Sequence, residues 1–199
     1  ISFSWLMLIA ISVFIFVSVS YFSSKTVTER FLILIALLGV QGVWIYEKYI
    51  TQIKQEFIVY QVHKTSVIGL RFSDKMTVFN ADSIKNKVIA NMLSASKIGE
   101  RLDSILYSSK LPNLLKFKED YIIVVDSFGV YDTKFKNEFI LLRQSPKVNL
   151  NRLIDELAPK MIIADGSNYK NMVEHWETIC KRKDIPFYNT RTQGAFILK

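Results

Sequence analysis

The apolar positions divide the chain into a strongly hydrophobic N-terminal part and a mixed C-terminal part. Ile1–Phe22 is an uncharged run in which the polar side chains are mainly serines. At about 1.5 Å per residue, a helix of this length spans the roughly 30 Å hydrocarbon core of a membrane. Phe31–Tyr46 is a second, shorter apolar run, and aromatic residues at its end suit the water–lipid interface. The two runs predict a transmembrane helical hairpin joined by the link Ser23–Arg30.

Two other structures could explain these apolar runs. A cleaved signal peptide would need a basic start, a shorter apolar run and a small-residue cleavage site, and the first run lacks all three. A buried core helix is the alternative for the second run, but the neighbouring apolar run favours a membrane hairpin. The chain begins with Ile rather than Met, so we expect a segment of a longer polypeptide. Lys25 and Arg30 favour a cytoplasmic link and therefore an extracytoplasmic C-terminal domain.

Residues 51–199 combine the periodicities of strands and helices. Alternating or short apolar runs predict strands at Phe57–His63, Ser66–Phe72, Met76–Phe79, Leu102–Tyr107, Tyr121–Val125 and Phe139–Leu142. Helical spacing predicts a helix over Asp82–Leu93, and Ser73–Lys75 is a plausible turn.

The last third shows the clearest pattern. We expect, in order, a helix Leu150–Leu157, a buried strand Met161–Ala164, a turn Asp165–Asn168, a helix Tyr169–Lys183 and closing strands Pro186–Asn189 and Ala195–Leu198 around Gly194. The apolar stripe of the long helix comprises Tyr169, Met172, Val173, Trp176, Ile179 and Cys180. Strands that pair first and later alternate with helices predict a layered α/β (α+β) domain with a mixed sheet. The domain organisation is therefore a membrane hairpin over 1–50 and one globular domain over 51–199.

Charge adds a preference for anionic partners. The formal net charge is +8, and residues 1–50 carry three cations against two carboxylates, so +7 belongs to residues 51–199. A basic domain attracts nucleic acid or an anionic membrane, although a solvated surface explains the same excess. Lysines next to aromatic residues are candidate contacts to single-stranded DNA, because cations neutralise phosphates and aromatic rings stack on bases. These candidates are Lys116, Lys118, Lys134 and Lys136, and Lys147, which has no aromatic neighbour, is a further possible DNA contact. An amphipathic edge strand gives the same alternation.

The sequence contains few residues that could serve as metal ligands in a metal-dependent hydrolase. A binuclear zinc site needs imidazoles and carboxylates clustered around each metal, but the only histidines are His63 and His175, far apart in the chain. His63 is expected to end a strand, and His175 lies one step off the apolar helix stripe. No HxHxDH, HExxH, GxSxG, Walker A or GxGxxG motif occurs. The single cysteine, Cys180, is expected to pack on a helix face. We therefore assign no catalytic residue, no metal ligand and no cofactor.

One turn keeps two interpretations open. Asp165–Asn168 lies where a strand meets a helix, so its backbone amides could hold an anion at the helix N-terminus. It could equally be a structural turn with helix capping. A hydrolase that uses Asp165 or Asp126 with a divalent ion is a further alternative.

The C-terminal segment resembles the end of ComEC family competence proteins, with the closest likeness to Bacteroidetes-type members. The likeness rests on Asn149–Ile154, Pro159–Tyr169, Trp176, Cys180, Ile185–Phe187, Thr190 and Gly194–Ile197. Within it, the turn and helix residues that match the family are Asp165, Gly166, Ser167, Asn168, Tyr169 and Trp176. The segment Phe57–Asp82 more loosely resembles the opening hairpin of the family's metallo-β-lactamase-like domain.

The resemblance implies a fold and a role in natural transformation, while the metal site does not carry over. Relatives with an intact domain have a DVGQGD-like opening and an HxHxDH motif. Here the opening reads Tyr60–Ser66 without an acidic residue, and the family's His-His-Gly segment aligns near Arg143–Lys147 without histidine. We thus expect a degenerate metallo-β-lactamase-like domain without metal ligands, behind the last spans of a membrane channel.

The expected function is that of a non-enzymatic C-terminal part of a multi-pass inner-membrane DNA-uptake channel. Its soluble domain would handle single-stranded DNA or brace the channel. The expected partners are the membrane, single-stranded DNA, the remaining transmembrane helices of the full-length protein and competence machinery proteins. A membrane-anchored nuclease with an unrecognised site and a purely structural interaction module are the alternatives.

Overall fold

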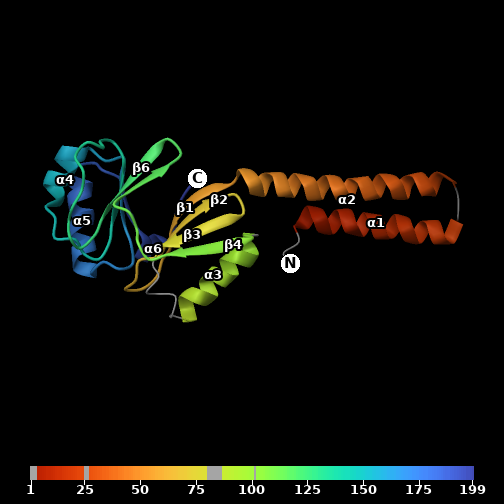
Figure 1. The fold of residues 1–199 in the computed structure, drawn as a ribbon, viewed down its shortest axis with the longest axis horizontal. Helices are drawn as coiled ribbons and strands as arrows, with labels where there is room; N and C mark the ends of the chain where they lie inside the picture. Colours follow the sequence, from red (N-terminus) through yellow and green to blue (C-terminus); the bar gives the residue numbers. More distant parts are fainter. Residues whose placement is uncertain (1–3, 25–26, 80–86, 101) are drawn as a thin grey trace.

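The fold is described from a computed structural model of the chain, in which residues 4–24, 27–79, 87–100 and 102–199 are described. A long helical hairpin projects from a layered soluble domain (Figure 1). The hairpin consists of α1 (Trp5–Ser24) and α2 (Val27–Ile53). Ser4 donates a hydrogen bond from its hydroxyl to the Glu47 carboxylate, which joins the start of α1 to α2.

Both hairpin helices are long and apolar enough to cross a membrane. The candidate spans are Trp5–Phe22 and Arg30–Ile53, with mean hydropathies of 2.3 and 1.5. The second helix is longer than its apolar run predicts, and both helices extend into the segment predicted as a link. At 27 residues, α2 is about 40 Å long, so its last turns reach beyond a hydrocarbon core of about 30 Å. These turns lead directly into the soluble domain.

The soluble domain contains two five-stranded sheets. In the order of pairing, the first sheet consists of β10 (Phe196–Leu198), β1 (Gln55–Val59), β2 (Ile68–Phe72), β3 (Lys75–Phe79) and β4 (Ser104–Ser108). Its strands pair antiparallel except for β3 and β4, which are parallel. The second sheet consists of β5 (Leu114–Phe117), β6 (Asp120–Val125), β7 (Phe139–Leu142), β8 (Met161–Ala164) and β9 (Phe187–Asn189). Here β6 to β9 run parallel.

The sheets pack face to face between helices, which gives four layers. Phe57 and Val59 of β1 point into a core between the sheets, where they join Ile122, Val124 and other side chains of the second sheet. Helix α3 (Lys87–Gly99) covers the outer face of the first sheet. Helices α4 (Leu150–Leu157) and α5 (Lys170–Arg182) cover the outer face of the second. The strict alternation along β1 and β6 follows from the two-residue period of a strand.

Several sequence predictions are confirmed and a few are wrong. The boundaries of β7, α4 and β8 agree with the prediction, and Cys180 is buried on the apolar face of α5. The strand predicted over Phe57–His63 already ends at Val59, so His63 lies in a turn. Helix α3 continues to Gly99, which places Ile98 in a helix, and the predicted helix start at 82–86 lies outside the described residues. Strand β5 was not predicted.

The two closing strands do not pair with each other. Strand β9 joins β8 in the second sheet, whereas β10 crosses to the first sheet and pairs with β1. The short helix α6 (Thr190–Gln193) and Gly194, at φ +86°, make this crossing between the sheets. The C-terminal strand therefore closes the sandwich beside β1, the strand that follows α2.

Candidate functional site

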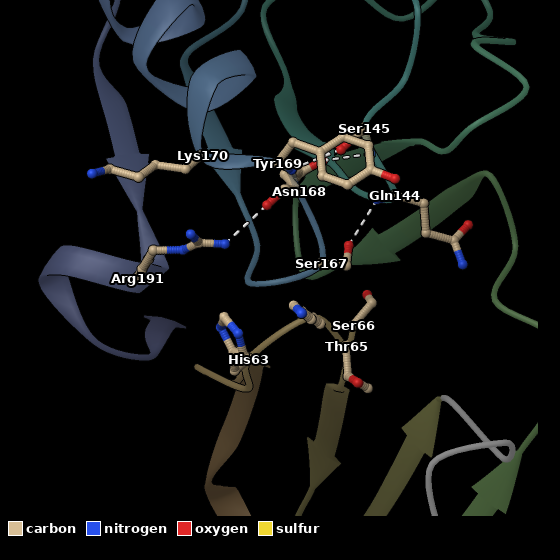
Figure 2. Close-up of a pocket in the computed structure, with 11 residues that line it drawn as sticks. His63, Thr65, Ser66, Gln144, Ser145, Ser167, Asn168, Tyr169, Lys170 and Arg191 are labelled. Carbon is tan, nitrogen blue, oxygen red and sulfur yellow. Dashed lines mark hydrogen bonds between the residues drawn. The ribbon is translucent and has the colours of Figure 1, made fainter.

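A cleft of about 630 Å³ opens at one edge of the sandwich, where loops of both sheets meet (Figure 2). The first sheet contributes the β1–β2 loop, which includes His63–Ser66. The second sheet contributes the segments that follow the carboxyl ends of β7, β8 and β9. The carboxyl ends of parallel strands are the usual place for a ligand in open α/β sheets. Since β1 runs away from Ile53, the β1–β2 loop and the cleft lie at the end of β1 that is distant from α2.

Gly166 allows the two sheets to meet at the cleft. A Cβ atom at this position would lie 2.0 Å from the backbone oxygen of Val62, which is closer than any side chain tolerates. The Lys64 N–H donates to the Gly166 carbonyl oxygen at 2.9 Å. The β1–β2 loop therefore packs backbone to backbone on the turn after β8.

The floor of the cleft is held by side chains of the same turn. Asn168 is buried, and its amide nitrogen donates to the Leu142 carbonyl oxygen at 2.7 Å while its Oδ1 accepts from the Ser145 N–H at 2.8 Å. The Ser167 hydroxyl oxygen accepts from the Gln144 N–H at 2.7 Å. These bonds fix the loop after β7 against the turn after β8, so the cleft is preorganised.

The lining is cationic. Lys64, Lys170, Arg191 and His63 line the cleft together with hydroxyl and amide side chains, and no carboxylate is among the lining residues that the structure describes. An Arg191 Nη donates to the Asn168 carbonyl oxygen at 3.0 Å, which holds the guanidinium beside the turn. Lys170 is the first residue of α5, whose N-cap Tyr169 makes no side-chain capping bond. The positive end of the helix dipole therefore adds to the side-chain charges.

Asp165 is the first residue of the Asp165–Asn168 turn, and it is buried, with 2% of its surface exposed. Its Oδ1 accepts hydrogen bonds from the Ser167 N–H, the Ser167 hydroxyl and the Asn168 amide. Burial raises the pKa of the Asp165 carboxyl, while the hydrogen bonds from Ser167 and Ser66 and the charge of Arg143 oppose the rise. The carboxyl shapes the turn from below and does not face the opening.

The family-matching residues separate into three groups. Ser167, Asn168 and Tyr169 line the cleft, while Gly166 and Asp165 support it from behind. Trp176 lies at 2% exposure in the core between α5 and the second sheet, so it stabilises the layer and does not reach the cleft. Tyr169 was predicted on the apolar stripe of the helix, but it precedes the helix and is 70% exposed because its side chain points out at the cleft rim.

The two segments that were compared with the family's metal-site motifs meet in this cleft. His63–Ser66 belongs to the segment compared with the opening motif, and Gln144 and Ser145 belong to the segment compared with His-His-Gly. Among the lining residues, His63 is the one imidazole, and His175 is exposed on α5 outside the lining. In the part of the chain that the structure describes, no three His, Cys, Asp or Glu residues are grouped so that they could hold a metal ion. This donor set does not fit a binuclear zinc centre.

The lysines proposed from sequence are exposed but lie mostly away from the cleft. Lys116 lies near the end of β5, Lys118 lies in the β5–β6 turn, and Lys134 and Lys136 precede β7. Because β6 and β7 are parallel, these four lie at the amino edge of the second sheet, opposite the cleft. Lys147 follows β7 at the carboxyl edge, outside the lining. Lys116 and Lys118 lie over the rings of Tyr121 and Phe117, at 5.9 and 5.7 Å from the ring centroids.

Sequence reasoning missed the cations that do line the cleft. Lys64, Lys170 and Arg191 come from three loops and have no shared spacing in the chain. The segments 60–66 and 143–147 were compared with motifs of one metal site, but only to note the missing ligands, and only the first segment carries one of these cations, Lys64.

Comparison with known proteins gives one match. The family model of the ComEC C-terminal domain matches residues 57–199. No curated protein and no solved structure matches the chain. The matched range covers the whole sandwich from β1 to β10 and begins just after α2.

Proposed function

The chain belongs to the ComEC family, which has a role in DNA uptake for competence, and from this premise we propose that its soluble domain handles single-stranded DNA without cutting it. In this proposal the cleft holds backbone phosphates of the incoming strand. The domain acts at the membrane, behind the hairpin of α1 and α2.

The cationic cleft carries this proposal. Lys64, Lys170 and Arg191 approach one opening from both sheets, with no carboxylate in the described lining. A phosphodiester needs cations and N–H donors, and it releases condensed counterions when it binds them. Hydroxyl and amide side chains add neutral donors around the same opening. These cations and neutral donors suit a DNA backbone that passes through the cleft without reacting covalently.

The proposal includes a metal-free variant of the metallo-β-lactamase-like fold. The order of layers, helix, sheet, sheet, helix, supports it, and so does the convergence of the two aligned motif segments in one cleft. In this variant, of the Bacteroidetes type, cations occupy the place of metal ligands. We assign no enzymatic activity, and a hydrolase that uses Asp165 is disfavoured because that carboxyl is buried under the turn.

The membrane arrangement is part of the same proposal. The two apolar helices act as the final spans of a multi-pass channel in the cell's inner membrane, together with further helices of the full-length protein. The basic link between them lies in the cytoplasm, and the soluble domain lies on the other side, where competence machinery proteins deliver DNA. Cysteine labelling of Lys64→Cys with a membrane-impermeant maleimide in intact spheroplasts tests this topology. Labelling only after lysis contradicts it.

The test of DNA handling is a salt titration with the 1–199 chain in detergent micelles and a labelled dT20 strand. Affinity should fall with salt, and Lys170→Gln should flatten the slope of log K against log salt by about 0.7. The matched control is Lys181→Gln, which removes the same charge at the other end of α5. Equal slopes for the two variants, or no binding by the unchanged chain, contradict the proposal.

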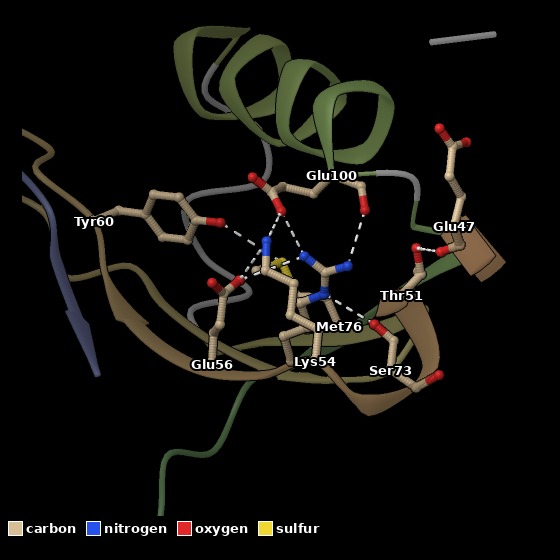
Figure 3. Close-up of polar contacts among 9 residues, drawn as sticks. Glu47, Thr51, Lys54, Glu56, Tyr60, Ser73, Met76 and Glu100 are labelled. Carbon is tan, nitrogen blue, oxygen red and sulfur yellow. Dashed lines mark hydrogen bonds and ion pairs between the residues drawn. The ribbon is translucent and has the colours of Figure 1, made fainter. Parts of the chain in front are cut away.

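Bracing of the channel is a second candidate function, favoured by a charged cluster at the membrane junction (Figure 3). We define this junction cluster as Lys54, Glu56, Arg71 and Glu100. Lys54 directly follows α2, and its ammonium pairs with the carboxylates of Glu56 and Glu100. The buried Arg71 guanidinium bonds the Glu100 carboxylate at 2.5 Å and the Glu100 carbonyl oxygen at 2.9 Å.

The junction cluster joins four elements at one point. Lys54 directly follows α2, Glu56 and Arg71 lie on β1 and β2, and Glu100 directly follows α3. A membrane helix tied in this way holds the domain in one orientation. Deleting residues 51–199 while scoring channel assembly and DNA uptake separately distinguishes the roles: bracing predicts loss of assembly, and DNA handling predicts assembled channels with poor uptake.

A further inference from the structure

Two aromatic side chains stand out on the surface of the soluble domain. Phe128 is 86% exposed and Tyr169 is 70% exposed, the highest values among the large hydrophobic side chains of the described residues from 55 to 199. Exposing a whole phenyl ring forgoes the favourable free energy of burying it, about 2 kcal/mol. A ligand that covers such rings would recover this free energy.

Both aromatic residues lie at the carboxyl edge of the second sheet. Phe128 follows the end of β6 and Tyr169 follows the end of β8, with the loop after β7 between them. A Cβ atom on Gly129 would lie 3.0 Å from Val148 Cγ1, so the turn that carries Phe128 packs on the loop after β7. Tyr169 itself lines the cleft, and Figure 2 shows its ring beside Ser145 and Asn168.

The backbone holds both residues in fixed turns. The Phe128 N–H donates to Asp126 Oδ1 at 3.0 Å, and the Gly129 N–H donates to the Asp126 carbonyl oxygen at 2.9 Å. The Tyr169 N–H donates to the Ser145 hydroxyl oxygen at 2.8 Å. An aromatic ring on a rigid turn loses little conformational entropy when it meets a flat partner.

The charge of the cleft indicates which kind of ligand could cover the aromatic rings at the carboxyl edge of the second sheet. The cleft beside Tyr169 is lined by Lys64, Lys170 and Arg191, which favours a polyanion, and Phe128 lies along the same edge of the sheet outside the lining. Single-stranded DNA offers both a charged backbone and free base faces, and stacking of a base on an aromatic side chain contributes about 1–3 kcal/mol. A protein partner would explain the exposed aromatic residues but not the cationic lining beside Tyr169.

We infer that Phe128 and Tyr169 are stacking platforms for unpaired bases of a DNA strand whose backbone lies in the cationic cleft. This inference rests on the proposed function and adds a specificity to it. Duplex DNA keeps its base faces stacked internally, so it gains from the cations alone. The two aromatic residues therefore make the site select single strands.

The test compares single-stranded and duplex DNA on the full 1–199 chain in detergent micelles. Fluorescence anisotropy of labelled dT20 should show Phe128→Ala and Tyr169→Ala each weakening binding by about 5-fold or more. Binding of a labelled 20-base-pair duplex should be unchanged. Tyr169→Phe keeps the ring and should bind like the unchanged chain. Tyr107→Ala, a half-exposed aromatic residue on β4, is the matched control and should have no effect.

The outcomes separate this inference from the proposed function. If the unchanged chain binds no single-stranded DNA, the proposed function fails and the inference fails with it. If the unchanged chain binds single-stranded DNA and the two alanine variants bind it with the same affinity, only the stacking inference is overturned. The same holds if the variants lose affinity for duplex and single-stranded DNA to the same extent. A 2-aminopurine base in the strand gives an independent readout, because stacking on Phe128 or Tyr169 quenches its fluorescence and the alanine variants should restore it.

Discussion

The Lys64 N–H donates to the Gly166 carbonyl oxygen at 2.9 Å, and this bond joins the loop of one sheet to the turn of the other. Lys64 adopts φ +58°, a left-handed conformation that a non-glycine residue rarely takes. The same residue that joins the two sheets therefore also lines the cleft. Stability and ligand binding are coupled at this contact.

Replacing Gly166 with alanine should disturb both properties. The new Cβ would meet the Val62 carbonyl oxygen, so the β1–β2 loop must move, at a cost of about 1–3 kcal/mol in unfolding free energy. Affinity for dT20 should fall because Lys64 moves with the loop. Urea unfolding in detergent micelles, followed by Trp176 fluorescence in a Trp5→Phe/Trp44→Phe background, measures the first effect. Gly99→Ala is the control, since nothing lies within 4 Å of its Cβ; equal losses for the two variants contradict the packing argument.

Replacing Asp165 with asparagine should change how stability depends on pH. The folded-state pKa of Asp165 is raised by burial, so the folded chain keeps a proton that the unfolded chain releases above about pH 3.8. Stability then falls as pH rises from this value towards the folded-state pKa, by at most about 1.4 kcal/mol per pH unit. Asparagine keeps an Oδ1 acceptor for Ser167 and Asn168 and removes the titration.

The Asp165→Asn comparison uses urea unfolding at several pH values between 3 and 7. The difference in unfolding free energy between the variant and the unchanged chain should grow in favour of the variant as pH rises. Other carboxyl groups titrate in both proteins and cancel in the difference. A difference that is constant with pH would show that Asp165 is not the group that resists ionisation.

The secondary structure of the second sheet could be predicted because its signals are local. The strands β7 and β8 are short apolar runs buried on both faces, and α4 has a strong apolar stripe and an asparagine N-cap, Asn149. Strand β5 was missed because Lys116 interrupts an otherwise apolar run. The crossing of β10 to the first sheet depends on tertiary packing, for which Gly194 gives only a turn signal.

The cleft was only partly predictable for a related reason. The Asp165–Asn168 turn was found because a strand-to-helix turn is visible in sequence. Its partners Lys64 and Arg191 are distant in the chain, and each lies in a loop whose composition resembles any solvated loop. The lysine–aromatic pairs that composition favoured, such as Lys116 with Tyr121, lie at the opposite edge because strand direction, which sequence alone leaves open, decides the edge.

Cys180 should be unreactive in the folded chain. Burial in the core under α5 raises the pKa of the Cys180 thiol to about 12, so almost no thiolate exists at neutral pH. Modification by N-ethylmaleimide, followed by mass spectrometry, should be slow in buffer and fast in denaturing urea. Ser94→Cys, exposed on α3, is the control in a Cys180→Ser background and should react at once. Rapid labelling of Cys180 without denaturant would show that this layer opens easily.

Replacing Glu100 with glutamine should loosen the membrane junction. Of its two carboxylate partners the buried Arg71 would keep the more distant one, Glu56 at 3.4 Å, beside its bonds to backbone carbonyls, and Lys54 would lose its closer carboxylate. Because the Glu100 side chain is 43% exposed, we expect a loss of about 1–3 kcal/mol rather than the full cost of a buried unpaired charge. The solvent-exposed pair Lys170–Glu174 provides the control, and Glu174→Gln should cost about 0.5 kcal/mol or less.

The loss of stability in the Glu100→Gln variant should depend on pH, and the variant should also loosen the structure locally at the end of α2. The hydrogen bond from Lys54 is the main cause that lowers the pKa of the Glu100 carboxyl in the folded chain. The ionised carboxyl therefore stabilises the fold fully above its ordinary pKa of 4.5, and this stabilisation is lost as pH falls through the lower folded-state pKa. The difference between the Glu100→Gln variant and the unchanged chain should therefore shrink in acid. Hydrogen exchange should speed up at the end of α2 near Thr51, since the junction cluster ties this end to β2 and α3. Unchanged exchange there, together with a loss of global stability, would mean that the cluster stabilises the domain without holding the membrane helix.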